Sequence, residues 1–157
     1  MLYIHIIACG RLRKGPEHDL ISDYIDRYER TGRNLGLGPV SMTEVEDKRG
    51  IGIAAESKLL RKAIPQKAVK IIMDERGKLL SSVDFSQKLS IWRDTGVHDV
   101  AILIGGADGL DPSLRAEADF TLSFGKMVWP HKLARVMLSE QLFRAASILG
   151  NTPYHRL

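Results

Sequence analysis

Two strand-length apolar runs, each closed by a glycine-bearing turn, constrain this chain more than any other feature. Residues 100–104 are followed by Gly105 and Gly106, and residues 120–124 are followed by Gly125. In an open α/β sheet the ligand crevice lies beyond the carboxyl ends of the strands, where glycine lets the backbone approach a ligand closely. Either turn alone fits an ordinary chain reversal equally well, but the pair predicts a binding site between the two turns.

Strand-like and helix-like segments alternate along the whole chain. Continuous apolar runs predict buried strands, and apolar side chains at helical spacing predict helices that cover the sheet. This alternation favours an α/β fold with a mainly parallel sheet flanked by helices, but it does not reveal the strand order. A chain of 157 residues, 44% of them hydrophobic, is expected to form one domain over residues 1–157. The expected strands are residues 2–9, 40–45, 68–73, 99–104 and 120–124, and the expected helices are residues 17–30, 51–64, a segment containing Phe85, Leu89 and Trp92, and residues 132–149.

Local signals also predict where some of these elements begin and end. The polar segment 74–78 is predicted as a turn after the third strand, and the glycine-rich stretch 32–39 as a loop, because it follows a helix. Ser81 is placed to cap the third helix. Asp111 followed by Pro112 predicts the start of another short helix, since proline fits the first helical position.

The N-terminal apolar run and the single cysteine bear on the compartment. Residues 2–9 are too few to span a membrane and lack the preceding basic residues of a signal peptide. Cys9 is the only cysteine, which excludes an internal disulfide and suits a reducing compartment. We therefore expect a cytoplasmic protein without a membrane segment.

The net charge of +4 is concentrated at the C-terminal end. Residues 126–157 hold five basic side chains against the single acid Glu140, so residues 1–125 are balanced. Such a basic end favours a phosphate-bearing partner, although a solvated helix face would have the same composition.

The last helix and the tail carry a second indication. Apolar residues spread over more than one face of residues 132–149, which favours burial against a second copy of the chain, and hence a homodimer. After Gly150 the tail brings together Tyr154, His155 and Arg156, side chains that suit RNA contact or catalysis more than a frayed end.

Four motifs occur in a fixed order along the chain. They are residues 103–110 (Leu-Ile-Gly-Gly-Ala-Asp-Gly-Leu), residues 129–131 (Trp-Pro-His), residues 135–145 (Arg-Val-Met-Leu-Ser-Glu-Gln-Leu-Phe-Arg-Ala) and residues 153–156 (Pro-Tyr-His-Arg). Together they resemble the RlmH family, small bacterial SPOUT methyltransferases that act on N3 of a pseudouridine in the 23S ribosomal RNA of the large subunit. The resemblance covers the whole chain, including the position of the last motif at the C-terminus. Each motif alone is weak, but the four in this order are specific.

The resemblance implies a C-terminal trefoil knot, a homodimer and S-adenosylmethionine as the methyl donor, with no metal. Ordinary rules of chain connection exclude a threaded chain, so the knot follows from the resemblance alone. The partner implied is large-subunit ribosomal RNA within the assembled ribosome. Three positions differ from the usual family pattern: leucine is common at Met73 and Trp129, and tyrosine at Phe143. By family correspondence, the donor contacts Met73, Gly105, Gly106, Gly125, Lys126, Met127, Val128, Trp129 and Pro130.

The chemistry implied by the resemblance asks for positioning and for removal of one proton. An activated methyl group needs an in-line approach of the ring nitrogen, and a base of near-neutral pKa assists, for which His131 and His155 are the candidates. His131 fits a structural role at the start of a helix equally well. Arg144 and Arg156 are candidates for contacting phosphate or a deprotonated base. Tyr154 is a candidate for stacking on a nucleotide, and Glu140 is expected to orient a neighbouring arginine.

Two other functional classes fit parts of the sequence. A non-catalytic RNA-binding module would use the same basic end without a cofactor pocket. A dinucleotide-dependent oxidoreductase would use the same sheet, but its glycine signature follows the first strand, where this chain has the basic loop 11–16 instead. Binding of S-adenosylmethionine distinguishes a methyltransferase from both.

Overall fold

The computed structural model describes residues 1–46, 50 and 52–156 and confirms an α/β fold with a parallel sheet. Its five strands lie in the order β2-β1-β4-β3-β5, and every neighbouring pair is parallel. The carboxyl ends of all five strands therefore face the same edge of the sheet. The elements are β1 (Leu2–Cys9), α1 (Pro16–Gly32), the 3-10 turn η1 (Arg33–Leu35), β2 (Leu37–Val45), α2 (Ile53–Ala63), β3 (Val69–Leu79), α3 (Ser82–Asp94), β4 (Asp99–Ile104), α4 (Pro112–Ala116), β5 (Phe120–Ser123) and α5 (His131–Leu149).

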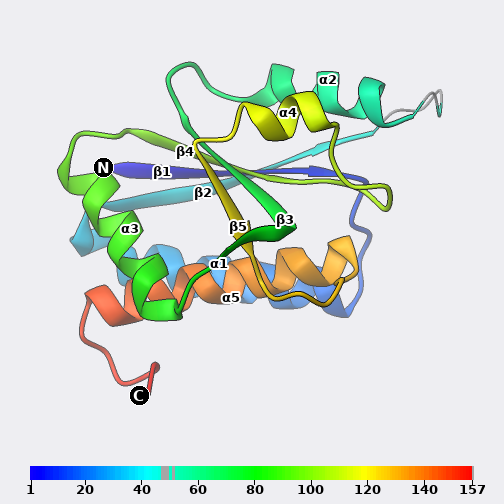
Figure 1. Cartoon of the computed structure of the whole chain (residues 1–157). Helices are drawn as coiled ribbons and strands as arrows, with labels where there is room; N and C mark the ends of the chain where they lie inside the picture. Colours follow the sequence, from blue (N-terminus) through cyan, green and yellow to red (C-terminus); the bar gives the residue numbers. More distant parts are fainter. Residues whose placement is uncertain (47–49, 51, 157) are drawn as a thin grey trace.

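Helices cover both faces of the sheet in unequal layers. α2 and α4 lie on one face, and α1, α3 and α5 lie on the other (Figure 1). Alternate strand residues feed two cores: Ile6 and Ile102 pack on the three-helix side, whereas Ile7 and Leu103 pack on the side of α2 and α4. The nearly continuous apolar character of β1 and β4 follows from burial on both faces.

The predicted helix starts are confirmed where the sequence has a capping side chain. The Ser81 hydroxyl accepts a hydrogen bond from the Asp84 backbone N–H at 3.0 Å, and the Asp111 carboxylate accepts one from Ser113 N–H at 2.9 Å. Each bond satisfies one of the N–H groups that the first turn of a helix leaves free. α2 begins at Ile53 in the structure. The predicted helix began at Ile51, which lies outside the described residues.

Two predicted connections are wrong in part, because the strands are longer than the sequence indicated. β2 begins at Leu37, within the predicted glycine-rich loop. β3 continues to Leu79 through the predicted turn 74–78, with a shift of register against β5. A Cβ atom on Gly77 would lie 2.7 Å from the Thr121 carbonyl group, so glycine allows the two backbones to approach. The polar residues of this segment suit an irregular edge pair that reaches the pocket described below.

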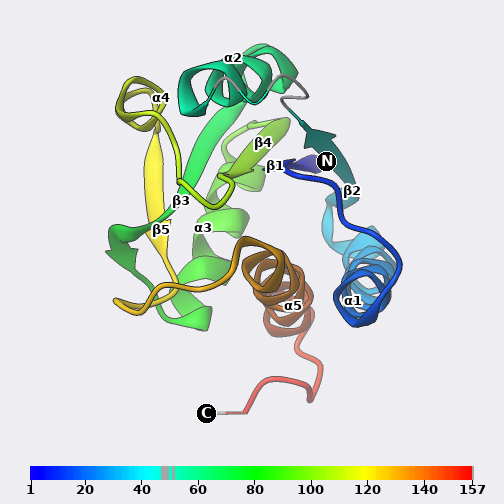
Figure 2. The same ribbon diagram turned by 90° about the vertical axis from the view of Figure 1, so that its right-hand side faces the viewer.

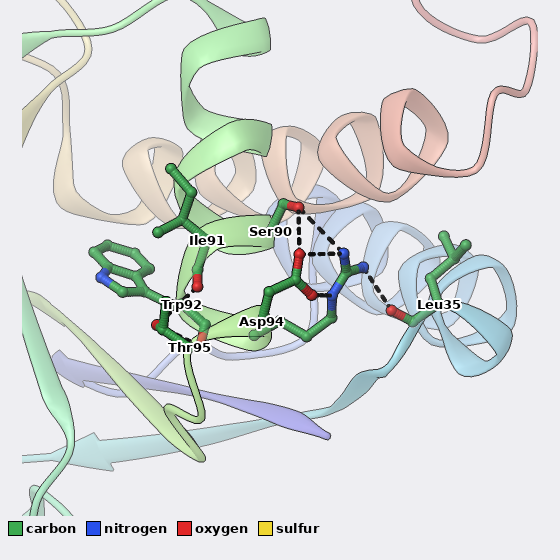
Figure 3. A network of polar contacts seen from close by, with 7 residues as sticks. Leu35, Ser90, Ile91, Trp92, Asp94 and Thr95 are labelled. Carbon is green, nitrogen blue, oxygen red and sulfur yellow. Dashed lines mark hydrogen bonds and ion pairs between the residues drawn. The ribbon is translucent and has the colours of Figure 1, made fainter.

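The end of α3 is tied to the turn that precedes β2. The Arg93 guanidinium donates to the Leu35 carbonyl oxygen at 2.7 Å and to the Asp94 carboxylate at 2.8 Å (Figure 3). Thr95 continues this group by donating from its hydroxyl to the Ile91 carbonyl oxygen at 2.8 Å. These contacts lie near the end of the sheet where β1 and β4 begin, opposite the carboxyl ends of the strands.

α5 is buried largely by its own chain. It lies between α1 and α3 beneath the sheet, as the view along the helix shows (Figure 2). Residues such as Leu138, Leu142, Ala145 and Ala146 are almost inaccessible to solvent. The expectation that the apolar faces of α5 require a second copy therefore rests on a wrong premise, because α1, α3 and the sheet already cover them. Within the described residues, no helix combines the length and the apolar character that crossing a membrane requires.

Candidate active site

A cavity of about 910 Å³ opens beside the middle of β3 and at the carboxyl ends of β4 and β5. Most of its wall comes from three segments: residues 73–76 of β3, the turn after β4, and the connection between β5 and α5. Glu17 of α1 and the first turn of α5 also line it. The sequence-predicted positions that line it are Met73, Gly105, Gly106, Gly125, Met127, Val128, Trp129, Pro130 and His131. Lys126, predicted with them, is exposed and does not line the cavity. The structure thus joins the two glycine turns in one site, as their positions after strands indicated.

Gly105 and Gly106 allow close packing within and around the first turn. A Cβ atom on Gly105 would lie 2.7 Å from the carbonyl group of Gly109, and one on Gly106 would face Glu56 and Cys9 at 3.3 and 3.4 Å. Neither missing side chain points toward open cavity space. The turn is closed by a hydrogen bond from Gly109 N–H to the Gly106 carbonyl oxygen at 3.0 Å.

Four carboxylates, none of them singled out from the sequence, are among the residues that line the cavity. Asp74 directly follows Met73 and accepts two hydrogen bonds from the Arg76 guanidinium, at 2.9 and 3.0 Å. These bonds hold the pKa of Asp74 below its usual value, and Arg115 at 3.8 Å adds to the effect. Asp74 is therefore ionised at neutral pH. Further acids on the cavity wall are Glu17, Glu75 and Asp108.

His131 is the first residue of α5 and the only histidine of the cavity wall among the residues described. Its partial burial lowers its pKa from the usual 6.5, and the positive charges of Arg135 and Lys132 lower it further. The imidazole is consequently neutral at physiological pH, which is the form that accepts a proton.

Arg135, one turn further along α5, has no solvent exposure. Its guanidinium donates to the carbonyl oxygens of Cys9 at 2.8 Å and Gly10 at 2.7 Å, and to the Glu44 carboxylate at 2.8 Å. It joins the start of α5 to the ends of β1 and β2. The sequence placed Arg135 in a motif, but nothing in the spacing distinguished a buried arginine from an exposed one.

The other predicted residues lie in the second half of α5 and in the tail that follows it. Glu140 pairs with Arg144 at 2.6 Å, confirming that this acid orients an arginine. Arg144 also contacts Nδ1 of His155 at 3.1 Å, and its guanidinium lies 4.8 Å from the ring centroid of Tyr154.

The Tyr154 side chain is held by this group and by aromatic packing. Its hydroxyl donates to Glu140 at 3.1 Å, and its ring packs on Phe143 with centroids 4.5 Å apart. Desolvation and the Glu140 carboxylate raise the pKa of Tyr154 to about 12. The tail is therefore ordered against α5 by specific contacts, while Arg156 is exposed.

One chain keeps the tail and the cavity apart. The cavity contacts the first turn of α5, whereas the tail leaves the opposite end of the helix (Figure 1) and contacts Glu140, Phe143 and Arg144 in its second half. Arg144 follows Ala134, which lines the cavity, by ten residues, or about 15 Å along the helix axis at 1.5 Å per residue. Among the described residues, no predicted tail residue lines the cavity of its own chain.

Known proteins resemble this chain over nearly its whole length. Residues 2–155 match the family model described as "Predicted SPOUT methyltransferase". A protein of Ruegeria pomeroyi named "Ribosomal RNA large subunit methyltransferase H" is 63% identical over 98% of this chain and 99% of its own length, and its Ruegeria sp. (strain TM1040) counterpart is 60% identical over the same shares. A solved structure of "a probable methylase family protein from Haemophilus influenzae Rd KW20" is 14% identical, with a TM-score of 0.49 over 99% of this chain and 70% of that one.

The solved structure is too distant to support an argument, but the family model and the sequence relatives agree. Both extend over all three segments of the cavity wall and over the tail cluster. The chain belongs to the RlmH family of SPOUT methyltransferases.

Proposed function

We propose that this protein transfers the methyl group of S-adenosylmethionine to N3 of a pseudouridine in the 23S RNA of the large ribosomal subunit. Family membership supports the reaction class, and the names of the relatives support the RNA substrate. The observation that carries the proposal is the cavity beside the middle of β3 and at the carboxyl ends of β4 and β5, which a non-catalytic RNA-binding module would not need. The protein would then act in the cytoplasm, where ribosomes are.

The cavity residues fit S-adenosylmethionine in size and charge. Its volume of about 910 Å³ lies in the range of small-molecule sites. Apolar side chains such as Met73 and Leu122 offer a surface for the adenine ring, and the backbone of residues 104–109 and 124–130 offers donors and acceptors. The ionised Asp74 suits a donor that carries a sulfonium and an ammonium charge.

When bound, S-adenosylmethionine supplies an already activated methyl group, so the protein has to position the substrate and manage one proton. The neutral His131 imidazole on the cavity wall is a candidate acceptor for the N3 proton. His155, the second candidate, would reach the reaction only if the tail does. Arg144 and Arg156 would contact phosphate or the negative charge that develops on the base, and Tyr154 would stack on a nucleotide.

We propose further that each active site is assembled from two chains of a homodimer. The separation of the tail from the cavity along α5 supports this arrangement, since the tail of a partner has to supply the substrate side. An exposed apolar patch at the cavity mouth also supports a partner chain. It consists of Met127, Val128, Trp129 and Leu133, which are between 38% and 78% exposed.

The trefoil knot is proposed on the same family basis. The chain leaves β5 at the edge of the sheet and returns beneath it as α5. It stays close to the stretch that runs from the second half of β3 to the start of α3: Ser123 donates to the Glu75 carbonyl oxygen at 3.2 Å, and Ser82 donates to Gln141 at 2.8 Å. These contacts on both sides of residues 75–82 are consistent with a C-terminal segment that passes through the loop they form.

Mass spectrometry of ribosomal RNA tests the proposal. Ribosomes from cells that lack this gene are incubated with the purified protein and S-adenosylmethionine, and their 23S RNA is digested and mapped. We expect one pseudouridine to gain the mass of a methyl group, at N3. RNA binding without methylation, by a protein that has no affinity for S-adenosylmethionine in calorimetry, would instead show a non-catalytic RNA-binding module.

A further inference from the structure

We propose that the loop between β1 and α1, residues 10–15, grips the substrate RNA beside the donor cavity by contacting its phosphates. This inference rests on the proposed function and adds a second basic surface to the C-terminal one. We call this segment the basic loop. It contains Arg11, Arg13 and Lys14, three cations within four residues.

The three cations project from the protein surface. Arg11, Arg13 and Lys14 are all exposed, and none of them forms an ion pair within residues 1–46, 50 and 52–156. Phosphate contacts by such side chains supply much of the affinity of proteins for nucleic acid.

The basic loop lies at the same edge of the sheet as the cavity. It follows β1 directly, and the cavity opens at the carboxyl ends of the parallel strands. A Cβ atom on Gly10 would lie 3.8 Å from Nε2 of His131, which lines the cavity. At the other end of the loop, Glu17 in the first turn of α1 also lines the cavity. An RNA strand whose base enters the cavity therefore passes these cations.

A buried charge cluster fixes the position of the loop. The Arg135 guanidinium, which has no solvent exposure, donates to the Cys9 and Gly10 carbonyl oxygens and pairs with Glu44. The same Glu44 oxygen accepts the backbone N–H of Leu12 at 2.5 Å. Two of these contacts, at the Gly10 carbonyl oxygen and the Leu12 N–H, hold the first half of the loop to α5 and to β2, and the Arg135–Glu44 pair joins the two anchors.

Burying an arginine is costly, and a merely solvated loop does not require it. A loop that is ordered before it meets RNA loses less conformational entropy on binding, which increases affinity and fixes the register of the strand. The cluster also joins the loop to the first turn of α5, where His131 lies. We infer that Arg135 acts as a positioning residue for the loop, whereas the exposed cations contact the RNA.

Neutralising the loop tests the inference. The triple variant Arg11→Gln/Arg13→Gln/Lys14→Gln is compared with the wild type on ribosomes from cells lacking this gene, with methylation followed at several salt concentrations. We expect KM for ribosomes to rise by about tenfold to a hundredfold near physiological salt, with kcat nearly unchanged. Losing three phosphate contacts should also reduce the slope of log KM against log salt by about two.

Two controls separate this role from general charge and from folding. Lys58→Gln/Lys62→Gln/Lys67→Gln removes three exposed cations on and just after α2, in the layer on the other face of the sheet. It should leave KM within about twofold. The charge-conserving variant Arg11→Lys/Arg13→Lys should keep most of the wild-type KM and salt slope. S-adenosylmethionine affinity, measured by calorimetry, should be unchanged in all three variants.

The outcomes distinguish the inference from the proposed function. If the wild type methylates no RNA, the proposed function fails. If the wild type is active but the neutralised loop leaves KM and the salt slope unchanged, the loop does not contact RNA. The inference would also be overturned if the Lys58/Lys62/Lys67 variant raised KM as much as the neutralised loop does. A loss of S-adenosylmethionine affinity in the loop variant would overturn it equally.

Discussion

Gly105 and Gly109 pack backbone against backbone in the turn that forms one wall of the cavity, so close that a Cβ atom on Gly105 would lie 2.7 Å from the Gly109 carbonyl group. The neighbouring Gly106 has more room, since its nearest atoms belong to Glu56 and Cys9 at 3.3 and 3.4 Å. The shape of the donor site thus depends on a contact within the turn, and two adjacent glycines should differ in their tolerance of a side chain.

The first prediction uses this difference. Gly105→Ala should displace the turn and reduce S-adenosylmethionine affinity by about tenfold or more, whereas Gly106→Ala should change it by less than about threefold, because the Glu56 carboxylate can move aside. Calorimetry on both variants measures the affinities, and circular dichroism checks that both remain folded. Equal affinities for the two variants would show that the Gly105–Gly109 contact does not shape the donor site.

The second prediction concerns the buried Arg135. Arg135→Met should lower the free energy of unfolding by about 3 kcal/mol, because it leaves the Cys9 and Gly10 carbonyl oxygens and the Glu44 carboxylate without their donor. The matched control is Arg30→Met, which removes an exposed ion pair with Asp26 on α1 and should cost less than about 1 kcal/mol. Urea unfolding measures both. Similar losses for the two variants would contradict the structural role of Arg135.

The third prediction is a dependence of stability on pH through His131, whose pKa is lowered in the folded protein. The unfolded chain, with the usual pKa of 6.5, takes up the proton at a higher pH than the folded chain does. His131 therefore lowers the free energy of unfolding as pH falls below about 6.5, and has no such effect well above that pH.

His131→Gln removes this effect of pH. Relative to the wild type, the variant should gain stability as pH is lowered from about 7 to about 5, in urea unfolding at each pH. The difference between the two proteins should be constant above about pH 7.5. A difference that stays constant over the whole range would mean that the pKa of His131 is not lowered.

The fourth prediction concerns the tail. Deleting residues 153–157 removes Tyr154, His155 and Arg156 and should abolish methylation, while S-adenosylmethionine affinity stays within about twofold, because the cavity lies at the far end of α5. Tyr154→Phe keeps the ring packed on Phe143 but loses the hydrogen bond to Glu140, and it provides a milder variant. Full activity of the truncated protein would exclude the tail from the site.

The sequence predicted those parts of the structure that depend on local pattern. The two glycine turns line one cavity because both follow parallel strands, which lie on either side of β3. Asp111 and Ser81 cap helices because a short acceptor side chain precedes each one. The extension of β3 through residues 74–78 was missed, because its polar residues and Gly77 have the composition of a turn. Only the approach of β5 makes that segment a strand.

Other features depend on contacts between distant residues, which no local pattern reveals. Arg135 is buried because Cys9, Gly10 and Glu44 meet it from two strands. The apolar faces of α5 gave a wrong reason for a second chain, since α1 and α3 already cover them. A better reason to expect a second chain is the separation of the cavity and the tail along α5. That separation is known only from the three-dimensional structure.

In the proposed dimer, each active site combines the cavity of one chain with the tail of another. Mixing tests it: subunits lacking residues 153–157 are combined with Gly105→Ala subunits, at an S-adenosylmethionine concentration too low for either variant alone to methylate. Heterodimers are confirmed by native mass spectrometry. If the site is shared, a heterodimer contains one intact cavity facing one intact tail, and methylation of ribosomes should return to about half the wild-type rate per dimer. If cavity and tail of the same chain work together, both sites of the heterodimer are defective. Heterodimers that show no methylation would therefore contradict a site shared between two chains.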